Sequence, residues 1–165
     1  MTWEPVTPIK AIDEAIVPFP PTEVWRVLAD IAAYPDWWPR HLGLRVVHRE
    51  RGLVGSEVEQ RPFGGRPLRC RVEAVEEPFS IRTRYHGGFI EGRGEFRLES
   101  VGSGTRVRYE LDVHAEGRAV ACLGRILPLG RIHSRLMLSV FRQLERVLMQ
   151  GKAASSPRKE GGAGF

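Results

Sequence analysis

Residues 15–39 have the sequence AIVPFPPTEVWRVLADIAAYPDWWP, and this stretch determines how the chain begins to fold. The mostly apolar segment 9–17 stops at Pro18, and two more prolines follow, so a strand has to end there. Pro21 fits the first turn of a helix, and the apolar residues after it recur at helical spacing as far as Ile31. We therefore predict one strand followed by a short amphipathic helix.

The next segment is crowded with aromatic rings. Tyr34, Trp37 and Trp38 lie beside two prolines, which leave room for a turn or two of helix at most. One interpretation is that the three rings form a wall of a pocket mouth and stack on a planar ligand. The other is that two of them only seal the core, and the sequence leaves both open.

From residue 42 to residue 115 apolar residues recur at every second position, which is the period of a β-strand. This pattern predicts six antiparallel strands, because glycine or proline breaks it where hairpins need turns. The breaks fall at 51–52, 64–65, 77–78, 87–88 and 102–104. Gly92 and Gly94 lie on the apolar face, where missing side chains let a sheet bend or leave space. We therefore expect a concave sheet.

The last element is predicted to be a long helix that starts near Ala119, is interrupted between Gly124 and Gly130, and then runs to about Gln150. Its apolar residues fall on one face together with His133. A helix this amphipathic has to lie on a large apolar surface, which here is the inner face of the sheet. The prediction is an α+β fold: a curved seven-stranded antiparallel sheet wrapped around a long C-terminal helix, with two short helices between strands 1 and 2.

The composition fits one domain, predicted over residues 1–150, with a disordered tail over 151–165 that is rich in glycine, alanine and serine. Of the 165 residues 42% are hydrophobic and 27% charged, which is close to globular averages. No apolar run is long enough to span a membrane, and the first residues lack the order of a signal peptide. We expect a cytoplasmic protein, either a monomer or a homodimer.

Several classes of function lack support in this sequence. Cys70 and Cys122 are far apart and without zinc-site spacing, so we expect two reduced, buried thiols and no metal. A phosphate loop and a GxSxG motif are also absent, and no cofactor is expected.

The net charge of +5 favours anionic surfaces. Four arginines of the last helix form a basic face. This face is either solvated or contacts a membrane or ribosomal RNA. Membrane contact stays open, and nucleic acid is not the expected partner. They are Arg131, Arg135, Arg142 and Arg146.

Residues 15–39 resemble the opening of the START-like polyketide cyclase/dehydrase proteins of the SRPBCC superfamily, in which a proline-ended strand leads to a Val-Trp helix and a Tyr-Pro-x-Trp turn. Residues 92–111, GRGEFRLESVGSGTRVRYEL, resemble the penultimate hairpin of these proteins. The resemblance spans about Ala11 to Met149 and implies a helix-grip fold. It also implies roles in binding or carrying lipids, quinones and other hydrophobic molecules, in polyketide cyclisation or, in some branches, on ribosomes. The run WWPR at 37–40 departs from the coenzyme Q-binding and ribosome-toxin branch.

If the apolar side of each strand lines a cavity, a sparse polar set points into it. The predicted members are His48, Ser56, Gln60, Thr83, Tyr85 and Tyr109, with His133 from the helix and Phe96, Leu136, Met137 and Val140 as apolar lining. These polar groups either orient a ligand or are satisfied by backbone groups and buried water. His133 is a candidate acid or base, and Tyr85 and Tyr109 are candidates to hold a carbonyl oxygen.

Three functions agree with these features. The leading hypothesis is a binding or carrier protein, without catalysis, for a lipid, a quinone or an aromatic polyketide. The second is a polyketide cyclase or dehydratase that uses His133 and the tyrosines as acid and base. The third is a basic interaction protein that docks on a ribosome or a membrane through the arginines of the last helix.

Overall fold

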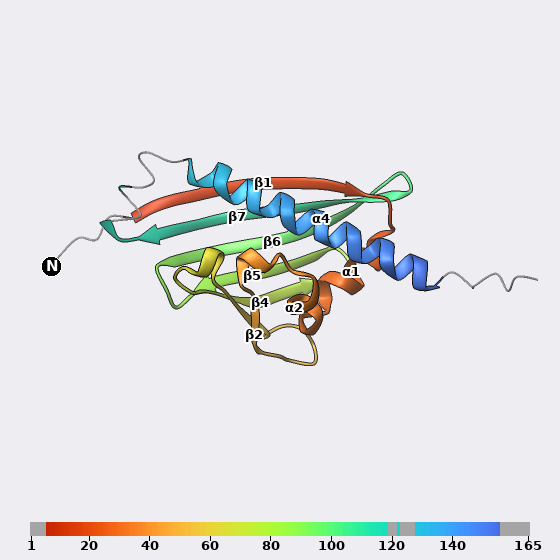
Figure 1. The fold of residues 1–165 in the computed structure, drawn as a ribbon, viewed down its shortest axis with the longest axis horizontal. Coiled ribbons are helices and arrows are strands. Elements are labelled where there is room, and N and C mark those ends of the chain that lie inside the picture. The colour runs from red at the N-terminus through yellow and green to blue at the C-terminus, as the bar shows by residue number, and fades with distance from the viewer. Residues whose placement is uncertain (1–5, 119–121, 123–127, 156–165) are drawn as a thin grey trace, which may run out of the picture.

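The computed structural model describes residues 6–118, 122 and 128–155. Its elements form one antiparallel sheet of seven strands and a long helix, which confirms the predicted α+β helix-grip fold (Figure 1). In chain order they are β1 (Val6–Val17), α1 (Pro21–Ala29), α2 (Tyr34–Trp37), β2 (Arg45–His48), β3 (Glu57–Gln60), β4 (Leu68–Glu76), β5 (Ser80–His86), β6 (Ile90–Val101), β7 (Gly104–Glu116) and α4 (Leu129–Ser155). Short 3₁₀ turns lie at Ile31–Ala33, Arg40–Leu42 and Pro62–Gly64.

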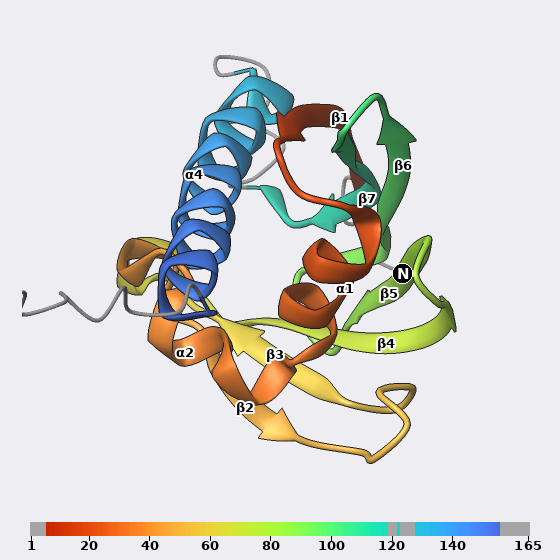
Figure 2. The same ribbon diagram turned by 90° about the vertical axis from the view of Figure 1, so that its right-hand side faces the viewer.

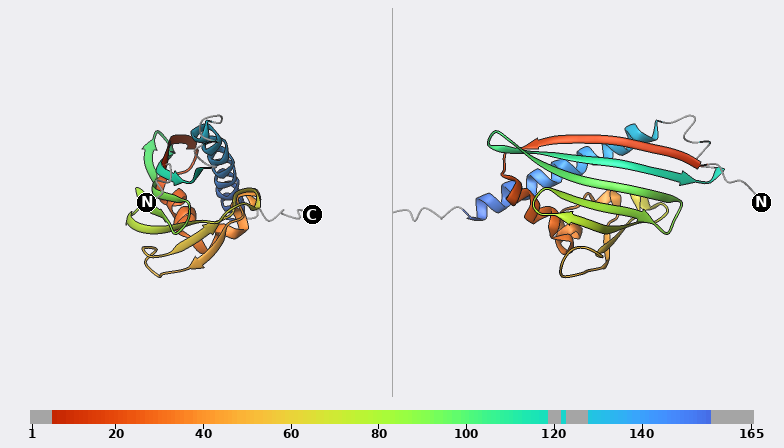
Figure 3. Two further views of the ribbon diagram at one scale, coloured as in Figure 1. Left: turned by 90° about the vertical axis from the view of Figure 1, so that its left-hand side faces the viewer. Right: turned by 180° about the vertical axis from the view of Figure 1, so that it is seen from behind.

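The strand order is β1-β7-β6-β5-β4-β3-β2, so the first strand pairs with the last and every other neighbour is a hairpin partner. Seen along its strands, the sheet curves from β1 round to β2, and α4 lies across the open side (Figure 2). No described helix covers the outer face of the sheet, as the view from behind shows (Figure 3). The helix therefore lies on the concave side, as the sequence predicts.

The outer face is charged. Arg106 and Glu99 form an ion pair of 2.7 Å across β6 and β7, and Arg108 lies 2.9 Å from Glu110. Exposed pairs of this kind contribute little stability each, but they account for the alternation of charged and apolar residues in these strands. The four arginines of the basic face of α4 are exposed as well.

The long helix extends past Gln150 to Ser155, so the segment predicted as a tail begins as helix. Its predicted start near Ala119 lies outside the described residues, as do residues 156–165. Cys70 is buried, but Cys122 is exposed, so the prediction of two buried thiols is wrong for Cys122. The reason is that Cys122 lies in the connection between β7 and α4, and connections run over the surface.

The two halves of α4 pack differently. Leu144 in the C-terminal half is fully buried near α1, where Val24 and Leu28 are buried too. In the N-terminal half Gly130 lets the helix approach β1, because a Cβ there would lie 2.9 Å from the carbonyl oxygen of Lys10. The space between the sheet and the C-terminal half of α4 is therefore filled with side chains, while the N-terminal half of α4 only covers the concave face of the sheet.

Candidate ligand-binding site

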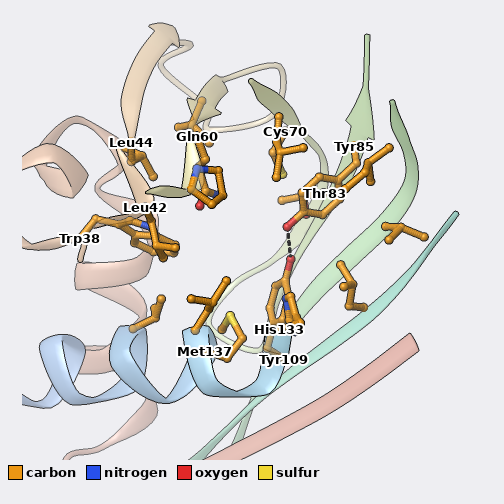
Figure 4. Close-up of a pocket in the computed structure, with 18 of the residues that line it drawn as sticks. Trp38, Leu42, Leu44, Gln60, Cys70, Thr83, Tyr85, Tyr109, His133 and Met137 are labelled. Carbon is orange, nitrogen blue, oxygen red and sulfur yellow. Dashed lines mark hydrogen bonds between the residues drawn. The ribbon is translucent and has the colours of Figure 1, made fainter. Parts of the chain in front are cut away.

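A cavity of about 230 Å³ lies under the N-terminal half of α4 (Figure 4). Strand side chains from the concave face form its floor, and Leu136, Met137 and Val140 of α4 form its roof. The apolar part of the floor comprises Val58, Val72, Ile81, Phe96, Leu111 and Val113. An apolar cavity of roughly 150 Å³ stays dry and binds benzene. The present cavity is therefore large enough for a molecule of about two rings.

Few polar groups line this cavity, and among the described lining residues none is Asp, Glu, Lys or Arg. The lining residues with polar side-chain atoms are Tyr34, Trp38, Gln60, Cys70, Thr83, Tyr85, Tyr109 and His133. Burial raises the pKa of the Cys70 thiol to about 12, so it stays protonated. An unpaired charge in such a space would lose its hydration without compensation. The cavity therefore suits a neutral molecule.

The most distinctive polar feature is a pair of phenols that come from strands separated by β6. The hydroxyl of Tyr109 on β7 lies 2.8 Å from that of Tyr85 on β5, in hydrogen-bond contact (Figure 4). Gly94 of β6 makes this contact possible, because a Cβ there would collide with the Tyr109 hydroxyl and lie 2.9 Å from its Cζ. Thr83 lies beside the pair: its hydroxyl donates to the Gly94 carbonyl oxygen at 3.0 Å, and its side chain also interacts with the Tyr109 hydroxyl.

Both phenols stay protonated at neutral pH. Burial raises the pKa of Tyr85 and of Tyr109 above the ordinary value of 10. One hydroxyl donates to the other, so the proton of the accepting hydroxyl remains available. The pair can thus donate one hydrogen bond to an oxygen of a bound molecule.

His133 stands beside this pair and faces a carboxylate that the sequence analysis missed. Its Nδ1 lies 3.3 Å from Oδ2 of Asp13 on β1, and its ring stacks on Tyr109 with centroids 5.7 Å apart. Asp13 is 8% exposed and is the cross-strand neighbour of Tyr109. The two atoms are close but not aligned as a hydrogen bond, and neither has another hydrogen-bond partner among the described residues. Burial lowers the pKa of His133, and Asp13 opposes this effect only in part.

The aromatic segment divides between the two interpretations that its sequence left open. Tyr34 and Trp38 line the cavity and stack on each other, with centroids 5.0 Å apart and ring planes 14° apart. The Tyr34 hydroxyl donates to the carbonyl oxygen of Leu28 at 2.5 Å, which fixes this ring. Trp37 is buried outside the lining, with its ring plane at 70° to that of Tyr34 and the centroids 5.1 Å apart. Two rings thus form a wall, and the third seals the core behind it.

Most of the predicted residues lie around the cavity, and three do not. In its lining are Tyr34, Trp38, Gln60, Thr83, Tyr85, Phe96, Tyr109, His133, Leu136, Met137 and Val140. The exceptions are Trp37, His48 and Ser56. The prediction that His48 points inward is wrong, because the register shifts between Val46 and His48 and such a bulge reverses the alternation of side chains.

His48 is instead exposed on the outside, with its Nε2 2.8 Å from a carboxylate oxygen of Glu50. Ser56 is buried, but it holds the turn before β3 and not a cavity wall. Its hydroxyl oxygen accepts a hydrogen bond from the backbone N–H of Glu50 at 2.9 Å. Neither residue can contact a molecule in the cavity from these positions.

The sequence did contain a signal for Asp13. In segment 9–17 it occupies the same face as Ile9, Ala11, Ala15 and Val17, while Ile12 and Ile16 point outward and are 60% and 63% exposed. An acidic residue on the inward face of an edge strand indicates a polar partner inside the fold. Isoleucines on both faces of the strand obscured this alternation.

A curved sheet, a helix across it and a mostly apolar hollow between them define a ligand-binding domain of the START-like, helix-grip class. Residues 9–128 match the model of the family described as polyketide cyclase / dehydrase and lipid transport, and the chain belongs to this family. The predicted resemblance is therefore confirmed. A search of the curated proteins finds no match.

Solved structures show the same fold at low sequence identity. A protein of Thermus thermophilus is 22% identical, with a TM-score of 0.68 over 89% of this chain and 99% of that one. Norcoclaurine synthase from Thalictrum flavum, solved with dopamine and hydroxybenzaldehyde, is 11% identical, with a TM-score of 0.66 over 88% of each chain. A START superfamily protein of Mycobacterium smegmatis is 18% identical, with a TM-score of 0.63 over 86% and 97%.

None of the helices among the described residues is long and apolar enough to cross a membrane. No group of three or more His, Cys, Asp or Glu side chains among those residues is placed to hold a metal ion.

Proposed function

We propose that this protein binds one neutral, largely planar aromatic molecule of about two rings, with an oxygen atom of that molecule at the Tyr85–Tyr109 pair. The observation that carries this proposal is the cavity itself: a space of about 230 Å³ that is apolar except for one phenol pair and a few further polar groups. A buried donor that finds no acceptor costs about 1–3 kcal/mol, so the pair selects ligands that bear an oxygen.

The size and the walls of the cavity favour rings over long chains. Tyr34 and Trp38 present stacked aromatic surface, which suits a flat molecule. A cavity of roughly 150 Å³ binds one benzene, so a cavity of about 230 Å³ matches a compact molecule of about two rings better than a long acyl chain. Among lipids, quinones and aromatic polyketides, the cavity therefore favours the last two. The structure of norcoclaurine synthase holds small aromatic molecules in the same fold, which supports this choice.

A titration with 2-naphthol and naphthalene tests the proposal. Both are two-ring molecules, and only 2-naphthol carries an oxygen. We expect one saturable site for each, with 2-naphthol bound roughly 2- to 10-fold more tightly, since one hydrogen bond contributes about 0.5–1.5 kcal/mol. In the double variant Tyr85→Phe/Tyr109→Phe this preference should shrink, because neither hydroxyl of the pair remains to donate.

Substitutions that add the same side chain inside and outside the cavity provide the control. Val140 lines the cavity and is fully buried, whereas Leu138 on the same helix is 47% exposed and outside the lining. Val140→Phe should fill the space and abolish binding, while Leu138→Phe should leave the dissociation constant unchanged. Equal affinity of both variants for 2-naphthol would show that the ligand binds elsewhere.

A further inference from the structure

Asp13 and His133 form a polar contact that ligand binding alone does not require. Asp13 comes from the edge strand β1 and His133 from α4, and the side chains are 8% and 19% exposed. Taking a carboxylate out of water is costly unless a partner compensates for it. Among the described residues the only partner within ionic distance of Asp13 is Nδ1 of His133. The Asp13–His133 contact therefore orients the imidazole ring of His133.

The carboxylate determines which nitrogen of His133 carries the proton. Because a carboxylate oxygen can only accept, the favoured tautomer has its hydrogen on Nδ1, the ring nitrogen 3.3 Å from Oδ2. The lone pair is then on Nε2, on the other side of a ring that lines the cavity. Burial lowers the pKa of His133, so at neutral pH this nitrogen is free to take a proton.

The same ring lies against the phenol pair. His133 stacks on Tyr109, and the hydroxyl of Tyr109 contacts that of Tyr85 (Figure 4). Consider a bound molecule whose oxygen accepts a hydrogen bond from the phenol pair. The carbons next to that oxygen then lie in the part of the cavity that His133 borders. A base beside a carbon and a donor at an adjacent carbonyl oxygen is the arrangement that proton removal from carbon requires.

We propose that the cavity catalyses proton transfer at carbon: His133 removes a proton from the carbon next to a ketone of the bound molecule, the Tyr85–Tyr109 pair holds the ketone oxygen, and Asp13 positions His133. The inference rests on the proposed binding function. The C–H bond breaks and its proton goes to Nε2, while the electron pair forms a C=C bond and leaves negative charge on the oxygen. Return of a proton from Nε2 to carbon reverses these changes, so the step needs no oxidant, reductant or second substrate.

Deuterium exchange into 2-tetralone tests this step without knowledge of the natural ligand. This two-ring ketone has exchangeable hydrogens beside its carbonyl group. In D₂O the protein should raise the exchange rate, followed by NMR, above that of buffer. His133→Gln should lose 100-fold or more of the added rate, the lower end of general-base effects. His114→Gln is the matched control, because His114 is on the other face of β7 and should leave the rate unchanged.

Asp13→Asn tests the positioning role with a readout other than lost rate. The groups that face His133 are Asp13 from β1 and Tyr109 from β7, with Tyr85 beyond it. Asp13 raises the pKa of His133, so its removal should move the rise of the exchange rate with pH to lower pH. The maximal rate should fall by roughly 10-fold or more, as for other orienting groups, with little change in KM. An unchanged pH profile would overturn the role of Asp13.

Binding of 2-tetralone, measured in the same tubes by saturation transfer, separates the two proposals. Absence of binding by the folded protein would overturn the binding function, and the catalytic inference with it. Binding accompanied by exchange no faster than that of His133→Gln would overturn the catalytic inference alone. Thermal unfolding of each variant shows that the proteins compared are folded.

Discussion

Replacing Gly94 by alanine should displace Tyr109 from its place in the cavity. The added Cβ would collide with the Tyr109 hydroxyl, and it would lie 2.9 Å from Cζ and 3.1 Å from the Thr83 hydroxyl oxygen. The ring has to move, which breaks its contact with Tyr85. Overpacking costs about 1–3 kcal/mol and the lost hydrogen bond about 1 kcal/mol, so we expect a destabilisation of about 2–4 kcal/mol.

A thermal scan measures this effect. For a chain of this length each kcal/mol corresponds to a shift of roughly 2–4 °C, so the Tm should fall by roughly 5–15 °C. Gly52→Ala is the control, because a Cβ at Gly52 would meet no atom within 4 Å. Its Tm should be unchanged or slightly higher. If Gly94→Ala has the Tm of the control and keeps the preference for 2-naphthol over naphthalene, the Tyr109 side chain does not pass over Gly94 of β6 to reach Tyr85.

Three further substitutions test the polar groups around the sheet. Arg45 and two other arginines hold the pKa of Glu59 at about 2, below its ordinary 4.5. Glu59→Gln should therefore lower the free energy of unfolding, measured in urea, above pH 4.5, and this difference from the wild type should vanish towards pH 2. Burial lowers the pKa of His133, so the wild type should lose stability relative to His133→Gln as the pH falls through about 6.5; parallel curves would contradict this. Tyr34→Phe leaves the carbonyl of Leu28 without its donor and should cost about 1–3 kcal/mol, measured by denaturant titration.

The sequence predicted the fold well because its main signals are local. Pro18 ends β1, and the glycine or proline breaks mark the hairpins, so the number of strands and their pairing follow from turn chemistry. The amphipathic pattern of the last helix likewise predicted which face covers the sheet. Its end was misplaced, because residues 151–155, GKAAS, carry no amphipathic pattern.

The site was harder to predict because it depends on contacts between distant elements. The bulge after Val46 turned His48 outward, and alternation alone gives no sign of it. The phenol pair depends on Gly94 of the strand between Tyr109 and Tyr85, so three residues on three strands have to be considered together. Asp13 was missed for a similar reason, since its partner His133 is on the helix at the other end of the chain.

Whether the space beneath α4 takes up a ligand is decided by NMR contacts between bound 2-naphthol and side-chain methyl groups. We expect intermolecular NOEs from the naphthol ring to Met137, Leu111 and Val140, which line the cavity, and none to Ile12 or Ile16 on the outer side of β1. NOEs to the two isoleucines without any to Met137, Leu111 and Val140 would place the ligand on the outer surface and contradict a binding cavity between sheet and helix.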